Sequence, residues 1–546
     1  MPASLPRTTS RLLICAQCRK ALLNPSKRRR FATGISSTPE IYDVVTVGGG
    51  PAGLALLAAL KSSPITSHLK TALIETQDLS RTRHWSLPDD QYSNRASSLT
   101  PSSVSFLEET GGWRHVDQTR VQAYDEMQVW DASNDATLQF DWRADAQRYN
   151  APPQTVATMT ENANLTKGLL ELIAELGAET ALFSSTNVAR ITLGEDDPEG
   201  LNLSMWPVLH LESKSKSESE SASSQGKGTF SATTIAARLL VGADGFNSPV
   251  RAFAGIESHG WDYQRHGVVA TLSVQPVDGS NNSDSNSNSN IDASFDLFSD
   301  DPLPNRATAY QRFLPQLGGP IAILPLPNNR ASLVWSTTPR HATYLKSLSP
   351  LGQVSMINAA LRLSQPDISY LFTLPPTAPE EHDAELRWRL QHTSAPPVAR
   401  QPPIVTSVQE GSLASFPLRF RHAASLVSPR VALVGDAAHT VHPLAGQGLN
   451  LGLADARALA AMVAYAVEHG MDLGDPLALE RYAADRFGKG LLMAGGVDAL
   501  NSLYQIGGGG DGILSSLLGR ARGLGMQFVD SGLVPGLKGL IMKQAG

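Results

Sequence analysis

A run of glycines near the amino end of the chain has the spacing of a dinucleotide-binding turn. Gly48, Gly50 and Gly53 follow an apolar segment and open a segment of helical composition. Glycines so placed allow a tight turn and let a pyrophosphate approach a helix N-terminus, where free amides and the helix dipole favour an anion. Glu75 ends the next apolar segment, roughly twenty residues farther on, where a carboxylate can bind a ribose hydroxyl. The pattern predicts FAD or NAD rather than NADP, and the alternative is a glycine turn with a structural role only.

A second glycine-rich motif lies far downstream. Gly435 and Asp436 come directly after an apolar segment, and the carboxylate is placed to hold the hydroxyls of a ribityl chain. A glycine-rich loop then leads into a helix that we expect to begin near Gly448 or Leu449. The N-terminus of that helix would direct partial positive charge at the N1/C2=O edge of a flavin and stabilise its anionic reduced ring.

A third motif lies between the other two. Asp244 stands in an Asp-Gly turn after an apolar segment, and Arg251 follows it. By itself this could be an ordinary Asp-Gly turn. The three motifs in this order along the chain are a much more specific signal than the turn alone. His439 and His442 follow Asp436 closely in the chain, and we expect them to have a packing role rather than a catalytic one.

The elements that must position these residues can be read from the apolar pattern. A strand at 41–47, a helix at 51–62 and a strand at 70–75 form a β-α-β unit, which implies a parallel sheet. Two more buried strands are expected at 239–241 and 431–434, so this sheet is assembled from distant pieces of chain. Alternating patterns predict a second, antiparallel sheet flanked by helices, with strands at 265–274, 309–314, 319–325 and 331–337.

Charge separates the amino end from the rest of the chain. The 546 residues include 45 basic and 51 acidic ones, yet residues 1–38 contain Arg and Lys and no acid. This composition, rich also in Ser and with leucines for an apolar face, predicts a mitochondrial transit peptide that is cleaved near Pro39. A basic tail that is disordered or binds nucleic acid is the alternative. The remaining acidic body is unsuited to general nucleic-acid binding, because that requires clustered Lys and Arg.

Cysteine usage and hydropathy exclude further classes of protein. Cys15 and Cys18 both lie in the expected transit peptide, so the mature chain has no cysteine for a disulfide, a cysteine-ligated metal or a nucleophile. We predict no metal site. No apolar run reaches the roughly 18 residues of a membrane span.

The ordered triple of motifs resembles the flavoprotein aromatic hydroxylases of the para-hydroxybenzoate hydroxylase type. Within that group, the chain looks most like the mitochondrial ubiquinone-biosynthesis flavin monooxygenases. The narrower resemblance rests on residues 94–101, 124–131, 261–263, 268–271 and 319–326, and it extends from Ile41 to about residue 505. Two low-complexity segments, 213–228 and 279–290, look like disordered insertions.

The resemblance implies a role for each matching residue. The glycines at 48, 50 and 53 would cradle the FAD pyrophosphate, Glu75 the adenosine ribose, and Arg95 the phosphate–ribityl region. Asp244 matches the aspartate of the Asp-Gly motif, and Asn162 is a weaker match. Gly435 and Asp436 would hold the ribityl chain. The isoalloxazine would be lined by Pro443, Leu444, Gly446, Gln447, Gly448, Leu449 and Asn450. No catalytic side chain is assigned, because the flavin performs the chemistry with Pro443 and Leu444 near the ring.

The expected fold class is α/β, with a Rossmann-like FAD-binding domain interrupted by an antiparallel-sheet substrate domain and followed by a helical C-terminus. After the transit peptide at 1–38, the FAD-binding domain takes 39–110, 161–258 and 405–470. The substrate domain takes 111–160 and 259–404, and the C-terminal helical region takes 471–546. A C-terminal run of leucines and lysines, 532–543, could contact a membrane or could pack on the core of the protein.

By resemblance, the activity is C5-ring hydroxylation of a polyprenyl-4-hydroxybenzoate derivative through a flavin C4a-hydroperoxide, with O2 as co-substrate. The resemblance further implies a ferredoxin and its reductase as electron donors, other ubiquinone-biosynthesis proteins as partners, and a peripheral place on the matrix side of the inner membrane. Two alternatives stay open. One is a soluble NAD(P)H-dependent aromatic hydroxylase, and the other is a flavin-bearing scaffold subunit of a lipid-synthesis complex.

Overall fold

The computed structural model describes residues 39–134, 136–142, 155–177, 180–196, 201–214, 230–275, 307–394, 396–398, 401–441 and 447–488. The described residues from Glu40 to Gly488 belong to one compact unit. The expected transit peptide, the segment 279–290, nearly all of 213–228 and the run 532–543 lie outside the described residues. So do Pro443, Leu444 and Gly446.

The first sheet has five parallel strands in the order β19-β11-β1-β2-β8, with β18, β10 and β9 added antiparallel. Its parallel strands are β1 (Glu40–Val47), β2 (Thr71–Ile74), β8 (Thr180–Phe183), β11 (Phe230–Gly242) and β19 (Val431–Leu433). The antiparallel ones are β9 (Thr186–Leu193), β10 (Pro207–Lys214) and β18 (Val427–Ser428). The expected parallel sheet, assembled from distant segments, is confirmed.

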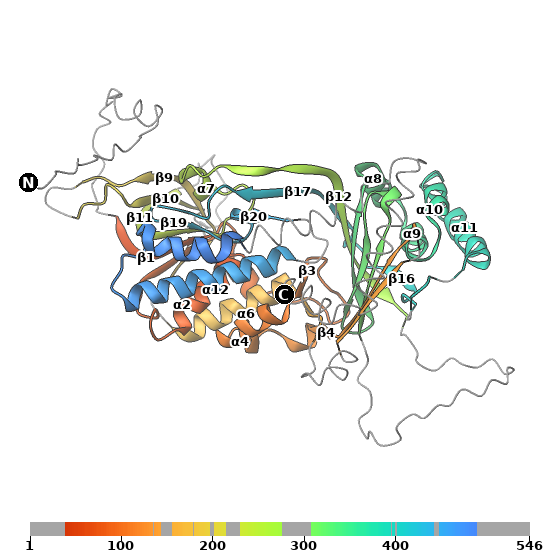
Figure 1. The fold of residues 1–546 in the computed structure, drawn as a ribbon, viewed down its shortest axis with the longest axis horizontal. Helices are drawn as coiled ribbons and strands as arrows, with labels where there is room; N and C mark the ends of the chain where they lie inside the picture. Colours follow the sequence, from red (N-terminus) through yellow and green to blue (C-terminus); the bar gives the residue numbers. More distant parts are fainter. Residues whose placement is uncertain are drawn as a thin grey trace, which may run out of the picture. The chain divides into compact units, whose positions relative to one another are not determined.

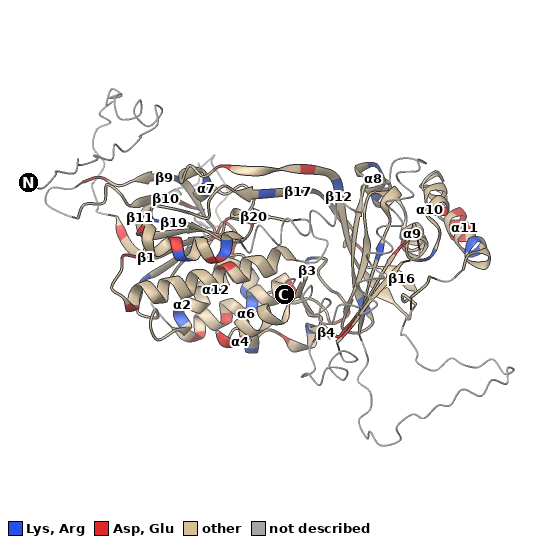
Figure 2. Ribbon diagram, in the orientation of Figure 1, with Lys and Arg blue, Asp and Glu red and all other residues tan. Residues whose placement is uncertain are grey.

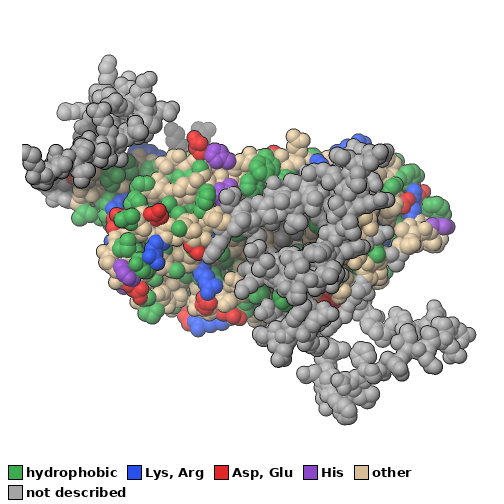
Figure 3. All heavy atoms as spheres, viewed as in Figure 1, with side chains coloured by type: hydrophobic (Ala, Val, Ile, Leu, Met, Phe, Trp, Pro, Cys, Tyr) green, Lys and Arg blue, Asp and Glu red, His purple; other side chains and the backbone are tan. Residues whose placement is uncertain are grey.

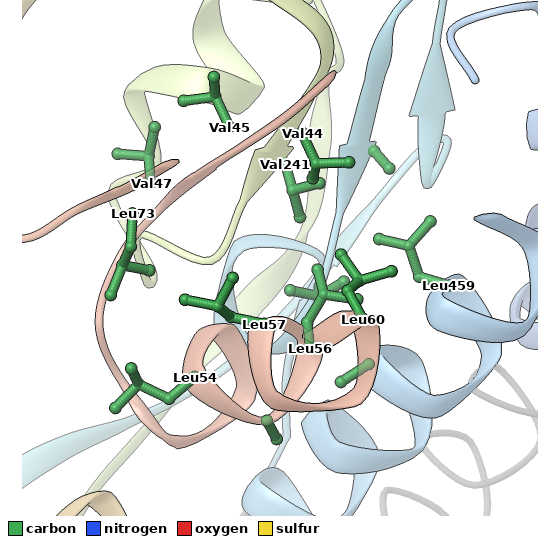
Figure 4. Close-up of a cluster of buried hydrophobic side chains, with 14 of the residues drawn as sticks. Val44, Val45, Val47, Leu54, Leu56, Leu57, Leu60, Leu73, Val241 and Leu459 are labelled. Carbon is green, nitrogen blue, oxygen red and sulfur yellow. The ribbon is translucent and has the colours of Figure 1, made fainter. Parts of the chain in front are cut away.

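Apolar helices cover this sheet, as Figure 1 shows. They are α2 (Pro51–Ser62), α4 (Pro101–Glu109), α6 (Asn162–Leu176) and α12 (Gln447–Glu468). Helix α2 packs against both α12 and α6, and few charged residues lie along α2 and α12 (Figure 2). Leu54, Leu57 and Leu60 of α2 are completely or almost completely buried, and Leu57 and Leu60 lie on the side of α2 toward the strands that carry Val44 and Val241 (Figure 4). Burial on both sides explains why α2 is apolar almost all round.

The second sheet has the order β20-β17-β12-β15-β14-β13-β5-β6, with β16 paired to β12. Its strands are β5 (Glu126–Asp131), β6 (Thr137–Asp141), β12 (Ser258–Val274), β13 (Thr308–Phe313), β14 (Ile321–Leu326), β15 (Arg330–Thr337), β16 (Val405–Val408), β17 (Ala414–Ala423) and β20 (His439–Thr440). It is antiparallel as expected except where β13 pairs parallel with β5. The flanking helices are α8 (Pro339–Ser347), α9 (Pro350–Arg362), α10 (Gln365–Leu371) and α11 (Pro379–His392).

A small third sheet and several short elements complete the described chain. The sheet has the order β3-β7-β4 and consists of β3 (Ala96–Leu99), β4 (Gln122–Tyr124) and β7 (Ala157–Glu161). The short helices are α3 (Leu79–Arg83), α7 (Pro249–Phe253), η1 (Trp113–His115), η2 (Gln118–Arg120), η3 (Pro315–Leu317) and η4 (Gly435–Ala437). Residues 476–488 are helical as well.

The pairing of the long strands β12 and β17 concerns the predicted boundary between the substrate domain and the FAD-binding domain at residue 405. The segment 405–470, which the sequence assigns to the FAD-binding domain, begins with β16 and β17, and both pair with β12 of the second sheet. The domain boundaries remain a prediction. No helix in the described part of the chain combines the length and the apolar character that crossing a membrane requires. Side chains of both charges are interspersed with apolar ones on the face seen in Figure 3.

Candidate functional site

The turn between β1 and α2 needs glycine at two of its positions for packing. Gly48 has a φ of +109°, and a Cβ added there would lie 2.1 Å from the carbonyl oxygen of Ala243. A Cβ added to Gly53 would lie 2.1 Å from the carbonyl oxygen of Gly48. Helix α2 therefore approaches the turn more closely than any side chain would allow.

Gly50 has a different role from the other two glycines. It is the N-cap residue of α2, and Pro51 occupies the first helical position, where its missing N–H costs nothing. No described atom lies within 4 Å of a Cβ added to Gly50. The space beside Gly50, at the start of α2, is therefore open among the described residues, and it is the place that we expect a pyrophosphate to take.

Glu75 lies directly beside this turn. Its Oε2 accepts a hydrogen bond of 2.6 Å from the backbone N–H of Gly49, and its Oε1 accepts one of 2.7 Å from that of Gln77. The side chain is half-buried. A carboxylate has about four acceptor positions, so Glu75 can hold the turn and still accept a hydrogen bond from a ribose hydroxyl.

Asp436 stands in the short helix η4, directly after β19. Its neighbours Gly435 and Ala437 are buried, whereas the Asp436 side chain is accessible to solvent. Desolvation by the surrounding protein nevertheless raises the pKa of this carboxyl, against the opposing effect of His439. An accessible carboxylate that protein surrounds on several sides is suited to hold a ligand's hydroxyls.

Helix α12 begins at Gln447, one residue before the expected start. No described atom lies within 4 Å of a Cβ added to Gly448. Leu449 is partly buried and packs against the core. The amide of Asn450 accepts hydrogen bonds from the Thr100 N–H and the Ser103 hydroxyl and donates one to the Ser98 carbonyl. The Asn450 side chain thus joins α12 to β3 and α4, and a contact with the flavin ring remains a prediction.

Three small residues bring the two helix N-termini and the Asp436 turn together. A Cβ added to Gly452 of α12 would lie 3.2 Å from the Cβ of Ala52 in α2 and 3.3 Å from the Cα of Gly435. Gly435 itself has a φ of +60°. Any larger side chain at these positions would push the three segments apart. The sequence analysis did not single out Gly452 or Ala52, and their small size within apolar helices was the available signal.

The Asp-Gly motif is tied to the same place. Asp244 Oδ2 accepts a hydrogen bond of 3.1 Å from the Val250 N–H, while its Oδ1 is buried without a partner among the described groups. Burial raises the pKa of the Asp244 carboxyl, and hydrogen bonds from Ser248 and Val250 only partly offset this. Arg251 donates hydrogen bonds of 2.7 Å to the carbonyl oxygens of Phe246 and Ala437. Arg251 therefore links the Asp244 turn to the Asp436 turn.

Arg95 is exposed at the start of β3, and no described group forms a hydrogen bond with its guanidinium. Its backbone is fixed, because its carbonyl oxygen accepts a 2.9 Å hydrogen bond from the Asn162 N–H. Asn162 Oδ1 also accepts a hydrogen bond of 2.6 Å from the Ser97 hydroxyl. Asn162, a weaker match by sequence, thus holds the strand that carries Arg95.

A buried ion pair that was not predicted from the sequence lies next to this segment. Glu161 is fully buried and accepts hydrogen bonds from the Ser93 N–H and, at 2.7 Å, from Arg120 Nε. The Arg120 guanidinium also donates to the Gln91 carbonyl and lies 4.5 Å from the centre of the Tyr92 ring. A buried charge pair of this kind has no short sequence signature, because its members are 41 residues apart.

These features fit an extended anionic dinucleotide. The starts of α2 and α12 meet the accessible Asp436 carboxylate at the small-residue contacts, and Arg251 ties the Asp244 turn to the same place. In the part of the chain that the structure describes, no three His, Cys, Asp or Glu side chains are grouped as a metal would need.

Comparison with known proteins identifies the family. The chain matches the FAD binding domain family over residues 41–286 and 336–488. The ubiquinone biosynthesis monooxygenase COQ6 of Schizosaccharomyces pombe is 36% identical over 465 residues, which are 85% of this chain and 85% of the relative. The Saccharomyces cerevisiae protein of that name is 34% identical, with 87% of this chain and 90% of the relative covered. The human one is 33% identical, covering 86% and 87%.

Solved structures show the same fold. The p-nitrophenol 4-monooxygenase PnpA of Pseudomonas putida aligns with a TM-score of 0.55 at 16% identity, over 93% of this chain and 96% of that one. PqsL of Pseudomonas aeruginosa, solved with 2-aminobenzoylacetate, aligns with a TM-score of 0.53 at 20% identity, over 85% and 97%. Since the sequence relatives agree over most of their length, the chain belongs to the family of mitochondrial ubiquinone biosynthesis monooxygenases that carry an FAD binding domain.

Proposed function

We propose that this FAD-dependent monooxygenase of ubiquinone biosynthesis adds a hydroxyl group at ring C5 of a polyprenylated 4-hydroxybenzoate derivative. The observation that carries the cofactor's part is the contact of Ala52 in α2 and Gly452 in α12 with Gly435, which brings the starts of both helices to the Asp436 turn. The names of the sequence relatives support the ubiquinone-biosynthesis part. The ring position rests on the family resemblance.

Each part of the site has a defined task in this proposal. Bound FAD, once reduced, supplies the activation of O2 and the transfer of one oxygen atom to the phenol ring. The amides at Gly50 and Gly448 and the Arg95 guanidinium neutralise negative charge on the cofactor. Glu75 and Asp436 accept hydrogen bonds from its hydroxyls, which fixes its position along the sheet edge.

The reaction can be tested with purified full-length chain. The protein is loaded with FAD, reduced chemically without a partner, and mixed with O2 and a polyprenylated 4-hydroxybenzoate. We expect a product with one added oxygen atom, located at ring C5 by NMR, and none from Asp436→Ala under the same conditions. Bound FAD without any oxygenated product would favour the scaffold alternative, and hydroxylation at another ring position would contradict the C5 assignment.

We further propose a ferredoxin and its reductase as electron donors. The sequence has one dinucleotide fingerprint that follows a strand, and FAD occupies it in this proposal. Stopped-flow reduction with reduced ferredoxin, NADH and NADPH compares the donors directly. Rapid flavin reduction by NADPH alone would contradict the ferredoxin proposal and favour the NAD(P)H-dependent alternative.

We also propose that the enzyme is peripheral on the matrix side of the mitochondrial inner membrane, with other ubiquinone-biosynthesis proteins as partners. The composition of residues 1–38 and the word mitochondrial in the relatives' names support the compartment. Residues 532–543 are the candidate membrane contact. In liposome flotation, Leu537→Asp/Leu540→Asp should lose membrane association and keep its FAD and melting temperature. Early melting of that variant would contradict the membrane role of these leucines.

A further inference from the structure

Two buried histidines face each other where the second sheet reaches the Asp436 turn. Strand β17 pairs antiparallel with β20, and His422 lies directly opposite His439 in that pairing. Directly opposed residues of this kind have Cβ atoms about 4.5–5.5 Å apart. The side chain of His422 is 8% exposed and that of His439 is 3% exposed. The proposed function uses neither ring.

In each ring, a hydrogen bond identifies one nitrogen that carries a hydrogen, and the other nitrogen has no partner among the described groups. His422 Nδ1 lies 2.7 Å from the carbonyl oxygen of Ala423, so this nitrogen carries a hydrogen and Nε2 has a lone pair. His439 Nε2 lies 2.6 Å from Asp455 Oδ2 and carries a hydrogen for the same reason. His422 Nε2 and His439 Nδ1 are both buried, with no partner among the described groups. A second proton, on His439 Nδ1, would make these two atoms a donor and an acceptor that one bridging water can join.

The charges around His439 favour that second proton. Asp455 of α12 is 1% exposed and also accepts a hydrogen bond of 2.8 Å from Arg486 Nε. Asp436 lies three residues before His439 and acts on its charge as well. Arg486 thus supplies one positive charge beside the two negative charges of Asp455 and Asp436. A protonated His439 supplies the second positive charge, so that the buried charges are paired.

Among the described residues, the remaining neighbours supply no positive charge that could replace that of His439. Tyr482 donates its hydroxyl hydrogen to the Leu433 carbonyl, and burial raises its pKa well above 10, which keeps it neutral. His259 of β12 lies opposite His422 on the other side and is exposed.

The two rings differ in their affinity for protons. Burial opposes protonation of His439, but the Asp455 charge and hydrogen bond outweigh it and raise the pKa of His439. Burial lowers the pKa of His422, and its bond to the Ala423 carbonyl does not compensate. His439 is therefore the ring that takes the proton, and His422 is the neutral ring that can accept its hydrogen bond.

We propose that His422 and His439 act as a positioning pair that holds one proton between them and so keeps a positive charge beside the Gly435–Asp436 turn. This charge favours reduced FAD, whose flavin ring is anionic, over oxidised FAD, whose ring is neutral. The inference rests on the proposed placement of FAD at this turn. Because His422 belongs to β17, the second sheet contributes to the electrostatics of the cofactor site.

The test compares three variants of the full-length holoenzyme between pH 6 and pH 8. His439→Gln keeps a donor for Asp455 and removes the charge, and His422→Phe keeps the ring packed on Phe487 and removes the acceptor. His259→Gln, from the exposed histidine opposite His422, is the matched control. The measurements are the affinity for oxidised FAD and the midpoint potential of the bound flavin.

His439→Gln should weaken binding of reduced FAD about tenfold more than that of oxidised FAD, which lowers the potential by about 30 mV at every pH. His422→Phe should show this shift at pH 8 and lose it toward pH 6, because His439 then takes its proton only at the lower pH. His259→Gln should match the wild type.

Equal weakening of oxidised and reduced FAD in both variants would overturn the proposal and leave the pair a packing role. If His439→Gln does not fold, the same comparison of oxidised and reduced FAD binding in His422→Phe tests the proposal. Failure of the proposed FAD site can be distinguished from failure of the histidine pair. If FAD binds elsewhere, Asp436→Ala should retain its flavin. If Asp436→Ala loses flavin and neither histidine variant shifts the potential, the histidine pair itself is refuted.

Discussion

The guanidinium of Arg251 donates a hydrogen bond of 2.7 Å to the carbonyl oxygen of Ala437, although the two residues are 186 positions apart. The same group donates to the Phe246 carbonyl. One side chain therefore holds the Asp244 turn against the Asp436 turn, and the spacing of these two motifs depends on it.

Replacing Arg251 by Met should destabilise the fold and weaken FAD binding together. Each carbonyl left without its donor costs about 1–3 kcal/mol of unfolding free energy. Arg419→Met is the control, because Arg419 reaches the same loop only over the Phe246 ring, at 5.4 Å, a contact of about 0.5–1 kcal/mol. Equal losses in the two variants, measured by denaturant unfolding, would show that the two carbonyl contacts of Arg251 do not carry the effect.

Alanine at two glycines of the first turn should separate packing from binding. Gly53→Ala places a Cβ 2.1 Å from the Gly48 carbonyl, so the folded protein should be destabilised before any cofactor binds. Gly50→Ala meets no described atom within 4 Å and has an ordinary φ of −72°, so the apoprotein should keep its melting temperature. It should nevertheless bind FAD more weakly, because the new methyl group occupies the space of the pyrophosphate. Unchanged FAD affinity in Gly50→Ala would place the pyrophosphate elsewhere.

Asp436→Ala should lose affinity for FAD without loss of apoprotein stability. A hydrogen bond to a charged carboxylate contributes about 1.5–3 kcal/mol, so the dissociation constant should rise about ten- to a hundredfold. Asp436→Asn keeps the shape of the side chain and removes its charge, so its dissociation constant for FAD should lie between those of the wild type and Asp436→Ala. Flavin fluorescence titration measures the affinity, and a dissociation constant equal to that of the wild type would contradict the role of Asp436.

Arg95 and Arg120 lie near each other in the fold and should respond differently to substitution. Arg95→Gln should leave the melting temperature unchanged and weaken FAD binding, because the Arg95 side chain is exposed. Arg120→Met leaves the buried Glu161 without its ion pair, at a cost of about 3–5 kcal/mol. Thermal unfolding of both apoproteins checks this, and a stable Arg120→Met would show that Glu161 finds another partner.

His341 should make the fold less stable in acid. The ring stacks on Phe372 with 4.0 Å between ring centres, and burial lowers its pKa from the ordinary 6.5. A histidine with a lowered folded pKa contributes stability above about pH 6.5, because below that value the unfolded chain binds the extra proton. The difference in unfolding free energy between wild type and His341→Gln should therefore shrink as the pH falls below 6.5. A difference that is constant with pH would contradict the lowered pKa.

Much of the candidate site was predictable because its motifs are local. The glycines of the first turn, Glu75, Asp244 and Asp436 each stand at the end of an apolar strand, and turn geometry restricts which residues can do so. The parallel first sheet and the start of α12 followed from the same patterns. The parallel pairing of β13 with β5 did not, because alternation shows which face of a strand is buried and not the direction of its neighbour.

The sequence by itself determined the two glycine turns at which we propose that FAD binds, since a turn before a helix is set by residues adjacent in the chain. Only the tertiary structure decided what holds these turns together. The links from Arg251 to Ala437, from Asp455 to His439 and from Glu161 to Arg120 join different segments of the chain. Nothing in the local sequence marks their partners, because burial and charge balance select them only when distant segments pack.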